Sequence, residues 1–368
     1  MAKIFGIILF GIIAISIYGG MHYYVYHRIS RGLELPKNAR LYLRIFFIIF
    51  SFSFIAAQIT SRAMPSYWVY LIGMIWLGLL AIGVSAFIIK DILALFLPKY
   101  PKVLTLGALA VTILISGYSI WNAMLRPCAI KRLTIPIKKL PAEMNGMKIV
   151  HITDTHFDIL TQPDFVESIV KRINSLKPDI ILITGDITDI DVFRFKGYLD
   201  ALSKLSATHG VWAVAGNHEY YMRFDIFENM CAEAGINILA NSNAEIDSNF
   251  FVVGLVDDES GRFHNMPPDI DAAMEDVDTT KPVIMMYHRP RRFKKAVEMG
   301  VDLQLAGHTH AGQIPPIDLI VWLIYKYHYG LFKYRDSYIY TSSGAGTWGP
   351  PMRTFSRNEI ALIELVKE

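Results

Sequence analysis

The sequence is poor in cysteine, with only Cys128 and Cys231 among its 368 residues. Two cysteines do not make the disulfide framework of a small secreted domain, and they say little about the redox compartment. The formal net charge is +3, which is too small to indicate a nucleic-acid partner. Internal repeats and low-complexity segments are also missing. These absences argue against a disulfide-stabilised domain, a nucleic-acid-binding protein and a repeat protein.

Charge is scarce before about residue 125, although the chain as a whole is 53% hydrophobic. Long apolar stretches run from about Ile4 to Gly19, Ile45 to Ile59, Tyr67 to Ile89 and Val103 to Trp121. Each is near the ~17–25 residues that cross a bilayer. The first stretch lacks the cleavage site of a signal peptide. We therefore predict four transmembrane helices over residues 1–125 in contact with the lipid bilayer, with Lys90-Asp91 ending the third.

Basic residues near these stretches give conflicting evidence on orientation. The first connecting loop contains Arg28, Arg31, Lys37, Arg40 and Arg44 against Glu34. Because positive loops stay in the cytoplasm, this loop places both termini outside. The segment after the fourth stretch argues the other way, with Arg126, Lys131, Arg132, Lys138 and Lys139. The first helix usually dominates, so we expect a multi-pass cell-membrane protein with an extracytoplasmic C-terminal domain.

Beyond the apolar half, strand-like runs alternate with helical patterns, which is typical of an α/β domain. We expect residues 126–146 to form a linker and a first strand, and residues 147–368 to form one large domain. Helices are predicted through Phe165, Ile169 and Ile173 and from Asp191 to Leu205. Strands are predicted at Ile149–Ile152, Asp179–Ile183, Val211–Val214, Phe251–Val256, Val283–Tyr287, Leu303–Leu305 and Tyr338–Thr341.

Polar motifs follow five of these strands and supply candidate metal ligands. They are Asp154-Thr155-His156, Gly185-Asp186-Ile187-Thr188-Asp189, Gly216-Asn217-His218-Glu219, His288-Arg289-Pro290 and Gly307-His308-Thr309-His310. Oxygen and nitrogen ligands without thiolates suit Mn, Fe, Zn or Mg. Alternation along a strand would put residues i and i+2 on one face, so Asp154 could join His156, and His308 could join His310. Gly185 and Gly216 would permit sharp turns or close approach. A pair of metal ions points toward phosphoester hydrolysis, with Asp186 as the natural bridging ligand.

With these motifs the chain resembles the calcineurin-like metallophosphoesterase family from about Met147 to Leu365, and within it the bacterial membrane-associated or exported phosphodiesterase branch. The stretches Gly307–Ile314 and Ser343–Arg353, followed by Glu359-Ile360, support the resemblance. It implies a four-layer αββα sandwich of two sheets flanked by helices. It also implies two divalent ions, one held by Asp154, His156, Asp186 and His310, the other by Asp186, Asn217, His288 and His308. A metal-bridging hydroxide would attack phosphorus while His218 acts as general acid, oriented by Asp189.

Other polar residues have weaker claims. His151 is expected to support the sheet, and His209 to lie on the surface or cap a helix. Glu219 either supports a ligand or merely starts a helix. The acidic turn Asp257-Asp258-Glu259 is expected to be solvated. Asp158 is assigned a structural role. Arg289 could either contact phosphate or form a salt bridge. The loop that contains Arg262 and His264 could either contact substrate or be an ordinary surface loop.

The segment Ile314 to Tyr334 mixes apolar and aromatic residues with Lys326 and Lys333. It fits a core helix covering the sheet, or an interfacial segment beside the metal site. The second interpretation would suit a lipid-linked phosphoester or pyrophosphate, although soluble head-group esters and envelope polymers stay open.

The leading hypothesis is a membrane-anchored phosphohydrolase, a phosphodiesterase or lipid pyrophosphatase. The alternative is a catalytically silent membrane sensor or scaffold with the same fold. The complete ligand set and His218 count against that alternative. A transport unit is disfavoured because the spans lack buried charges and broken helices. A phosphoprotein phosphatase is disfavoured because no extra arginines adjoin Asp189. The oligomeric state stays open.

Overall fold

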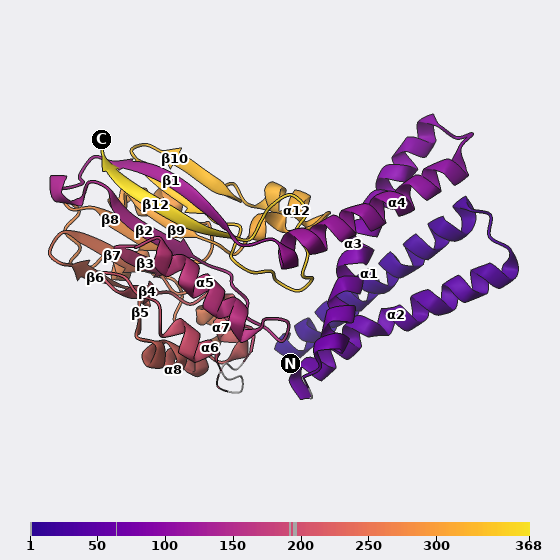
Figure 1. Ribbon diagram of the computed structural model, residues 1–368, viewed down its shortest axis with the longest axis horizontal. Helices are drawn as coiled ribbons and strands as arrows, with labels where there is room; N and C mark the ends of the chain where they lie inside the picture. The colour runs from indigo at the N-terminus through magenta and orange to yellow at the C-terminus, as the bar shows by residue number, and fades with distance from the viewer. Residues whose placement is uncertain (1, 64, 191–192, 194–196) are drawn as a thin grey trace. The chain divides into compact units, whose positions relative to one another are not determined.

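The computed structural model describes residues 2–63, 65–190, 193 and 197–368, with the side chains of residues 2–8, 10 and 61–63 left out. The chain forms two compact units, which are labelled by element in Figure 1. The helical unit comprises Met1–Leu125 together with Ile314–Ile317 and Gly349–Thr354. The sheet unit comprises Arg126–Gln313, Asp318–Trp348 and Phe355–Glu368. Two short segments from the C-terminal half therefore belong to the helical unit.

The helical unit is built from long helices that each contain a long apolar stretch. They are α1 (Ala2–Gly32), α2 (Lys37–Ala63), α3 (Tyr67–Phe96) and α4 (Pro101–Ile120), and a π-helical turn follows at Trp121–Leu125. Among the residues described, three segments are long and apolar enough to cross a membrane: Lys37–Thr60, Tyr67–Phe96 and Pro101–Leu125. The predicted first span, Ile4 to Gly19, lies in α1 but partly outside the described side chains.

The pair Lys90-Asp91 lies inside α3, although we expected it to end the third span. Its acid has partners on α1: the Tyr24 hydroxyl donates to Asp91 at 2.7 Å, and Arg28 pairs with it at 2.7 Å. The carboxylate is thus matched by a cation and a hydroxyl, which offsets the cost of partly burying it, and the helix continues to Phe96.

Within its described residues, the sheet unit contains two mixed sheets of six strands each. In the first sheet the order is β1 (Ala129–Ile137), β12 (Glu359–Lys367), β2 (Met147–Ile152), β3 (Ile180–Ile183), β4 (Val211–Ala213) and β5 (Ile236–Ile238). In the second sheet the order is β10 (Gly330–Tyr334), β11 (Ser337–Thr341), β9 (Leu303–Ala306), β8 (Val283–Met286), β7 (Phe250–Gly254) and β6 (Ser242–Ile246). The strands β2, β3, β4 and β5 are mutually parallel, and so are β11, β9, β8 and β7.

Strand β3 shows how the core is layered. Its residues Ile180 and Leu182 pack in a cluster with Val252 and Leu305 of the other sheet, so the two sheets share this core. Its alternate residues Ile181 and Ile183 belong to a cluster with helix residues on the opposite face. A strand buried on both faces explains the nearly continuous apolar run in the sequence.

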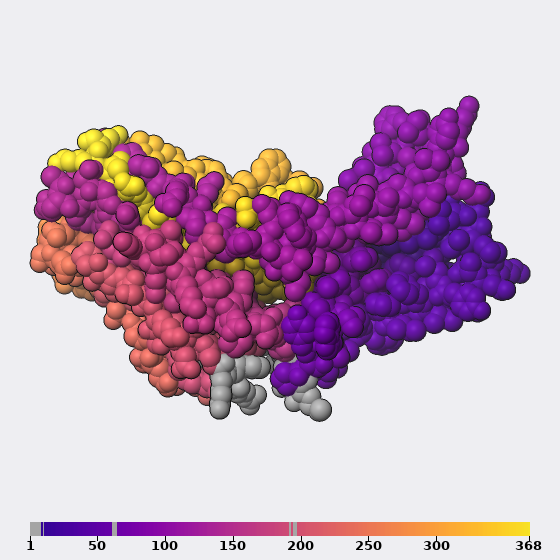
Figure 2. Space-filling view, viewed as in Figure 1, coloured from indigo at the N-terminus to yellow at the C-terminus, as the bar shows by residue number. Residues whose placement is uncertain are grey.

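Helices cover the outer face of each sheet. On the first sheet they are α5 (Pro163–Ser175), α6 (Tyr198–Leu202), α7 (Asn217–Met222) and α8 (Phe224–Ala234). On the second sheet they are α10 (Ile270–Ala273) and α11 (Phe293–Glu298). Other short helices in the described part of the chain are α9 (Ser260–Phe263), α12 (Ile317–Ile324) and 3-10 turns at Ala142–Met144 and His310–Gly312. In Figure 2, β12 in yellow and its parallel partner β1 in magenta lie side by side on the surface.

Each strand predicted from the sequence is present, with ends shifted by one or two residues. The strands β5, β6, β10 and β12 were not predicted individually. The predicted helix Asp191–Leu205 falls partly outside the described residues; in its second half α6 spans Tyr198–Leu202, three residues short of the predicted end. The segment Ile314 to Tyr334 is not one core helix: it contains α12, which has no buried residue, and the edge strand β10.

Candidate metal centre

The candidate ligands lie where parallel strands end. Asp154 follows β2, Asp186 follows β3 and Asn217 follows β4 in the first sheet, while His288 follows β8 and His308 follows β9 in the second. The carboxyl ends of parallel strands share one edge, where ligands commonly bind in α/β proteins. The packing of the two sheets therefore brings ligands from both sheets to one place.

Strand alternation does not place these side chains, contrary to our expectation. Strand β2 ends at Ile152 and β9 at Ala306, before the motifs begin. Asp154, His156, Asp186, His308 and His310 instead have positive φ angles between 42° and 70°. Such backbone costs ~1–3 kcal/mol per residue and persists only where surrounding bonds fix it.

Hydrogen bonds between the loops fix this backbone. The amide of Asp154 donates to the carbonyl of Gly185 at 3.0 Å, and the amide of His156 donates to that of Asp186 at 3.1 Å. Gly185 itself has φ +89°, and a Cβ atom there would collide with the backbone of Gly216. A Cβ atom on Gly216 would strike the Asp186 carboxylate. Both glycines thus allow the close approach that the sequence indicated.

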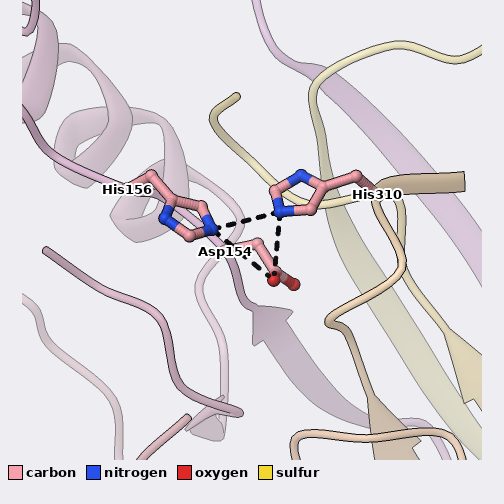
Figure 3. A group of neighbouring side chains, drawn as sticks. All are labelled: Asp154, His156 and His310. Atoms are coloured by element: carbon pink, nitrogen blue, oxygen red, sulfur yellow. Dashed lines mark hydrogen bonds and ion pairs between the residues drawn. The ribbon is translucent and has the colours of Figure 1, made fainter. Parts of the chain in front are cut away.

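Asp154, His156 and His310 form the first group of ligands, and Figure 3 shows their polar atoms turned toward one another. Nε2 of His156 lies 3.1 Å from Nε2 of His310, and the latter lies 3.4 Å from Oδ1 of Asp154. Oδ2 of Asp186 is 3.5 Å from Nε2 of His156. All these side chains are buried.

Asp186, His288 and His308 form the second group. Nε2 of His288 lies 3.2 Å from Oδ2 of Asp186, 3.1 Å from Nδ1 of His308 and 3.2 Å from Oδ1 of Asn217. The same Asp186 oxygen therefore faces both groups. The structure brings together the seven residues predicted as ligands.

The geometry of the imidazoles fits a bound cation. Nδ1 of His288 lies 2.7 Å from the carbonyl oxygen of Thr184, which can only accept, so Nδ1 carries the proton. In the neutral ring Nε2 then presents a lone pair to Nδ1 of His308. Two nitrogens that bind the same metal ion, each at ~2.1 Å, lie ~3.0–3.4 Å apart at ordinary ligand angles. The observed 3.1 Å separations in both groups agree with that spacing.

The electrostatics of these side chains also favour a cation. Burial works to lower the pKa of His288, but the carboxylate of Asp186 outweighs it and raises that pKa to about 10. Burial would raise the pKa of Asp186, yet the charge on His288 holds it well below its ordinary value. The buried carboxylates thus favour positive charge beside them, which a divalent ion would supply.

Asp189 and His218 lie beside the first group. Oδ1 of Asp189 is 2.8 Å from Nδ1 of His218 and 2.9 Å from Nδ1 of His156. One carboxylate therefore orients both imidazoles, which the sequence indicated for His218 alone. Although burial opposes it, the carboxylates of Asp186 and Asp189 raise the pKa of His218 to about 9. His218 is thus favoured in the protonated form that a general acid requires.

Glu219 has a supporting role that the sequence left undecided. Its buried carboxylate accepts the backbone amides of Gly216 and Asp186 at 2.7 and 2.9 Å and of Ile187 at 2.7 Å. It therefore ties the loop after β3 to the loop after β4. Burial, with the charge on Asp186, raises the pKa of Glu219 to about 7.

Sequence reasoning missed two residues near the ligands. The hydroxyl of Tyr325 lies 3.1 Å from Nε2 of His308, and the ring of Trp348 lies 6.2 Å from that of His218. Both stand in segments that the sequence marked out by composition, Ile314 to Tyr334 and Ser343 to Arg353. The composition of these segments did not indicate which aromatic side chain would lie near the ligands.

The expectation of a solvated acidic turn is wrong for Asp257, which is fully buried. Arg289 donates to both its carboxylate oxygens, at 2.7 and 2.9 Å. Of the two roles left open for Arg289, the structure therefore shows the salt bridge, in the form of a bidentate pair.

The other weak candidates lie outside the ligand groups. His151 is buried against the Thr184 hydroxyl at 2.8 Å, His209 pairs with Asp247 at 2.7 Å, and Asp158 accepts the amides of its own turn. His264 packs its ring against Tyr220 at 5.6 Å.

Comparison with known proteins gives consistent matches. The profile of the family described as calcineurin-like phosphoesterase matches residues 147–312. An uncharacterized metallophosphoesterase of Helicobacter pylori is 38% identical over 67% of this chain and 66% of its own length. A transmembrane protein with metallophosphoesterase domain of Danio rerio is 31% identical over 71% of this chain and 62% of its own. An uncharacterized metallophosphoesterase of Aquifex aeolicus is 33% identical over 64% of this chain and 91% of its own.

Proposed function

Because the chain belongs to the calcineurin-like phosphoesterase family, we propose that it is a membrane-anchored phosphohydrolase that uses two divalent metal ions to cleave phosphodiester or lipid-linked pyrophosphate bonds. One observation carries the proposal most directly. Two groups of oxygen and nitrogen ligands face a single shared carboxylate, that of Asp186. A carboxylate between two ligand sets is what a pair of ions ~3.5–4 Å apart requires.

The proposed ligands follow the observed groups. Asp154, His156, Asp186 and His310 would hold one ion, and Asp186, Asn217, His288 and His308 the other. When bound, such ions lower the pKa of water and neutralise charge on the phosphoryl oxygens. Their identity stays among Mn, Fe, Zn and Mg, because the ligand types suit each of them.

The chain itself supplies the proton for the leaving group. Nδ1 of His218 is engaged by Asp189, so Nε2 is the nitrogen left for the leaving oxygen. Asp189 also holds His156, which keeps Nε2 of that ring directed at the first group. We assign His218 as general acid and Asp189 as the residue that orients it.

For the helical unit we propose four membrane spans, namely α1 and the three candidate segments. The zebrafish relative named as a transmembrane protein supports membrane attachment. The basic first loop supports an extracytoplasmic sheet unit. The helix clusters on the outer faces of both sheets support a four-layer αββα arrangement.

A silent sensor or scaffold with the same fold is the second candidate. It is disfavoured because the ligands, His218 and Asp189 are all present and mutually oriented. A fold kept only for binding has no requirement for a general acid fixed in one orientation.

The test is hydrolysis of bis-p-nitrophenyl phosphate by the purified full-length protein in detergent, with bound metal measured by mass spectrometry. We expect turnover that a chelator removes and Mn restores, with two ions per chain. Asp186→Asn should bind less metal and lose at least about a hundredfold in kcat/KM. The matched control is Asp164→Asn, an exposed position on α5.

Each outcome is decisive for one candidate. Turnover that survives in Asp186→Asn would contradict the shared-carboxylate site. Two bound ions without turnover on diesters, phospholipids or lipid pyrophosphates would favour the scaffold.

A further inference from the structure

Helix α12 is apolar and unburied along its whole length. Its sequence, Ile-Asp-Leu-Ile-Val-Trp-Leu-Ile, contains one charged residue and no buried side chain. Leu319, Trp322 and Leu323 are 56%, 58% and 68% exposed. The structure therefore excludes a core helix. A contiguous apolar surface of this kind is rarely left in water and marks a place of contact.

The residues before and after α12 make defined contacts with the rest of the chain. Ile314 is buried in a cluster with Ala81, Ile82 and Met352, all within the helical unit. The helical unit also takes in Ile317, the first residue of α12, so the chain enters this helix directly from among the candidate membrane spans. At the other end, the amide of Tyr325 donates to the carbonyl of Val321, and the Tyr325 hydroxyl meets His308.

We propose that α12 lies in the acyl-chain side of the bilayer interface and that the metal centre takes the phosphoester of a lipid held in that bilayer. This rests on the proposed function and names its substrate class. The bilayer is identified as the occupant by chain continuity, since only two residues separate Ile314, which is buried against Ala81 and Ile82 of the helical unit, from the start of α12. Trp322 on the helix and Lys326 just beyond it are residue types that favour a membrane interface.

The length of α12 excludes a further membrane span. Its eight residues extend only ~12 Å, whereas the hydrocarbon core is ~30 Å thick. An interfacial helix needs no such length, because it lies along the surface with its apolar side chains immersed. The immersed helix then ends at the tyrosine that contacts a metal ligand.

Charge beside Tyr325 suits an anionic lipid. The guanidinium of Arg291 lies 5.2 Å from the centre of the Tyr325 ring, and its side chain is 48% exposed. Its nearest acidic partner, Asp258, stands 3.7 Å away. A lipid phosphate drawn toward His308 would therefore meet a cation at the polar end of α12 while its acyl chains stay on the apolar side.

The first experiment measures the position of α12 without relying on activity. A nitroxide spin label is attached to Leu323→Cys in full-length protein reconstituted into nanodiscs of phosphatidylethanolamine and phosphatidylglycerol. Its collisions with oxygen and with a water-soluble nickel chelate are compared. Leu114→Cys on α4, where Leu114 is 71% exposed, is the lipid control, and exposed Ser168→Cys on α5 is the aqueous control. The native cysteines are both buried, so labelling is selective.

We expect the label at position 323 to resemble that at 114, accessible to oxygen and protected from nickel. Nickel access like that at 168 would overturn the proposal. Dipolar broadening between labels on two chains, with protection from both reagents, would also overturn it and identify a second copy as the occupant.

The second experiment tests the substrate class. Turnover of labelled phosphatidylglycerol in vesicles is compared with turnover of soluble bis-p-nitrophenyl phosphate for the double variant Leu319→Ser/Leu323→Ser. We expect the vesicle-to-soluble ratio to fall at least tenfold. Equal losses on both substrates, or a wild-type protein that cleaves only the soluble diester, would overturn the lipid assignment. Failure of the proposed function is distinct, because a protein inactive on both substrates would still give the spin-label result.

Discussion

Nδ1 of His218 lies 2.8 Å from Oδ1 of Asp189, and this contact decides which imidazole nitrogen is free to act. The carboxylate can only accept, so Nδ1 donates and Nε2 remains for a leaving group. The same oxygen holds His156, a candidate ligand, at 2.9 Å. One half-buried carboxylate thus links the proposed acid to the proposed metal centre.

Replacing His218 by Ala should reduce activity to an extent that depends on the leaving group. A general acid contributes ~10²–10⁴-fold when the leaving oxygen is basic, as in an alkyl phosphodiester. A p-nitrophenolate leaves without protonation, so its hydrolysis should fall by no more than about tenfold. The measurement is kcat/KM for both diesters, with bound metal determined in parallel.

The matched control for this prediction is His209→Ala, because His209 pairs with Asp247 outside the ligand groups. It should leave both rates unchanged. Equal losses on both substrates in His218→Ala would argue against proton donation and for a role in binding the phosphoryl group.

Replacing Asp189 by Asn should weaken both metal binding and catalysis. The amide keeps the shape of the side chain but removes the charge that orients two imidazoles. Residues that orient a metal-binding histidine typically affect metal affinity by ~10–100-fold. Titration of the metal-free variant with Mn should show that loss, while His218→Ala should bind Mn as the wild type does. Unchanged affinity in Asp189→Asn would show that His156 does not depend on this carboxylate.

The sequence predicted which residues meet because the motifs stand at strand ends, and parallel strands share an edge. It did not predict how they meet. Asp154 and His156 were expected to share a strand face, but a left-handed turn orients both, and hydrophobic periodicity carries no signal for such turns. The edge strands β6 and β10 were missed because they are partly solvated and lack a long apolar run.

Contacts between residues far apart along the chain were also not predicted from the sequence. The acidic turn at Asp257 suggested solvent, yet Arg289, 32 residues away, neutralises it in the interior. The carboxylate of Glu219 accepts hydrogen bonds from the loops after β3 and β4. This role is apparent only once the pairing of the two strands is known. In both cases a residue's role depends on a partner that local patterns do not identify.

Glu219→Gln should destabilise the sheet unit. The amide group would bring its own N–H atoms toward backbone amides that now donate to a carboxylate, leaving at least one donor unmatched. An unsatisfied buried polar group costs ~1–3 kcal/mol. Thermal unfolding in detergent should show a midpoint lowered by several degrees, while Glu233→Gln, an exposed position on α8, should show no shift. An unshifted midpoint in Glu219→Gln would mean that these loops are held by other contacts.

His151 should make the protein sensitive to mild acid. Burial lowers the pKa of His151 to about 3 in the folded state, whereas an unfolded histidine titrates near 6.5. Below about pH 6.5 the unfolded chain therefore binds a proton that the folded chain cannot, and stability falls by up to ~1.4 kcal/mol per pH unit until about pH 3. In His151→Gln, which can keep a bond to the Thr184 hydroxyl, the unfolding midpoint should decrease less between pH 7.5 and 5.0 than in the wild type. Parallel decreases in the two proteins would show that other groups, such as the metal-binding imidazoles, account for the acid sensitivity.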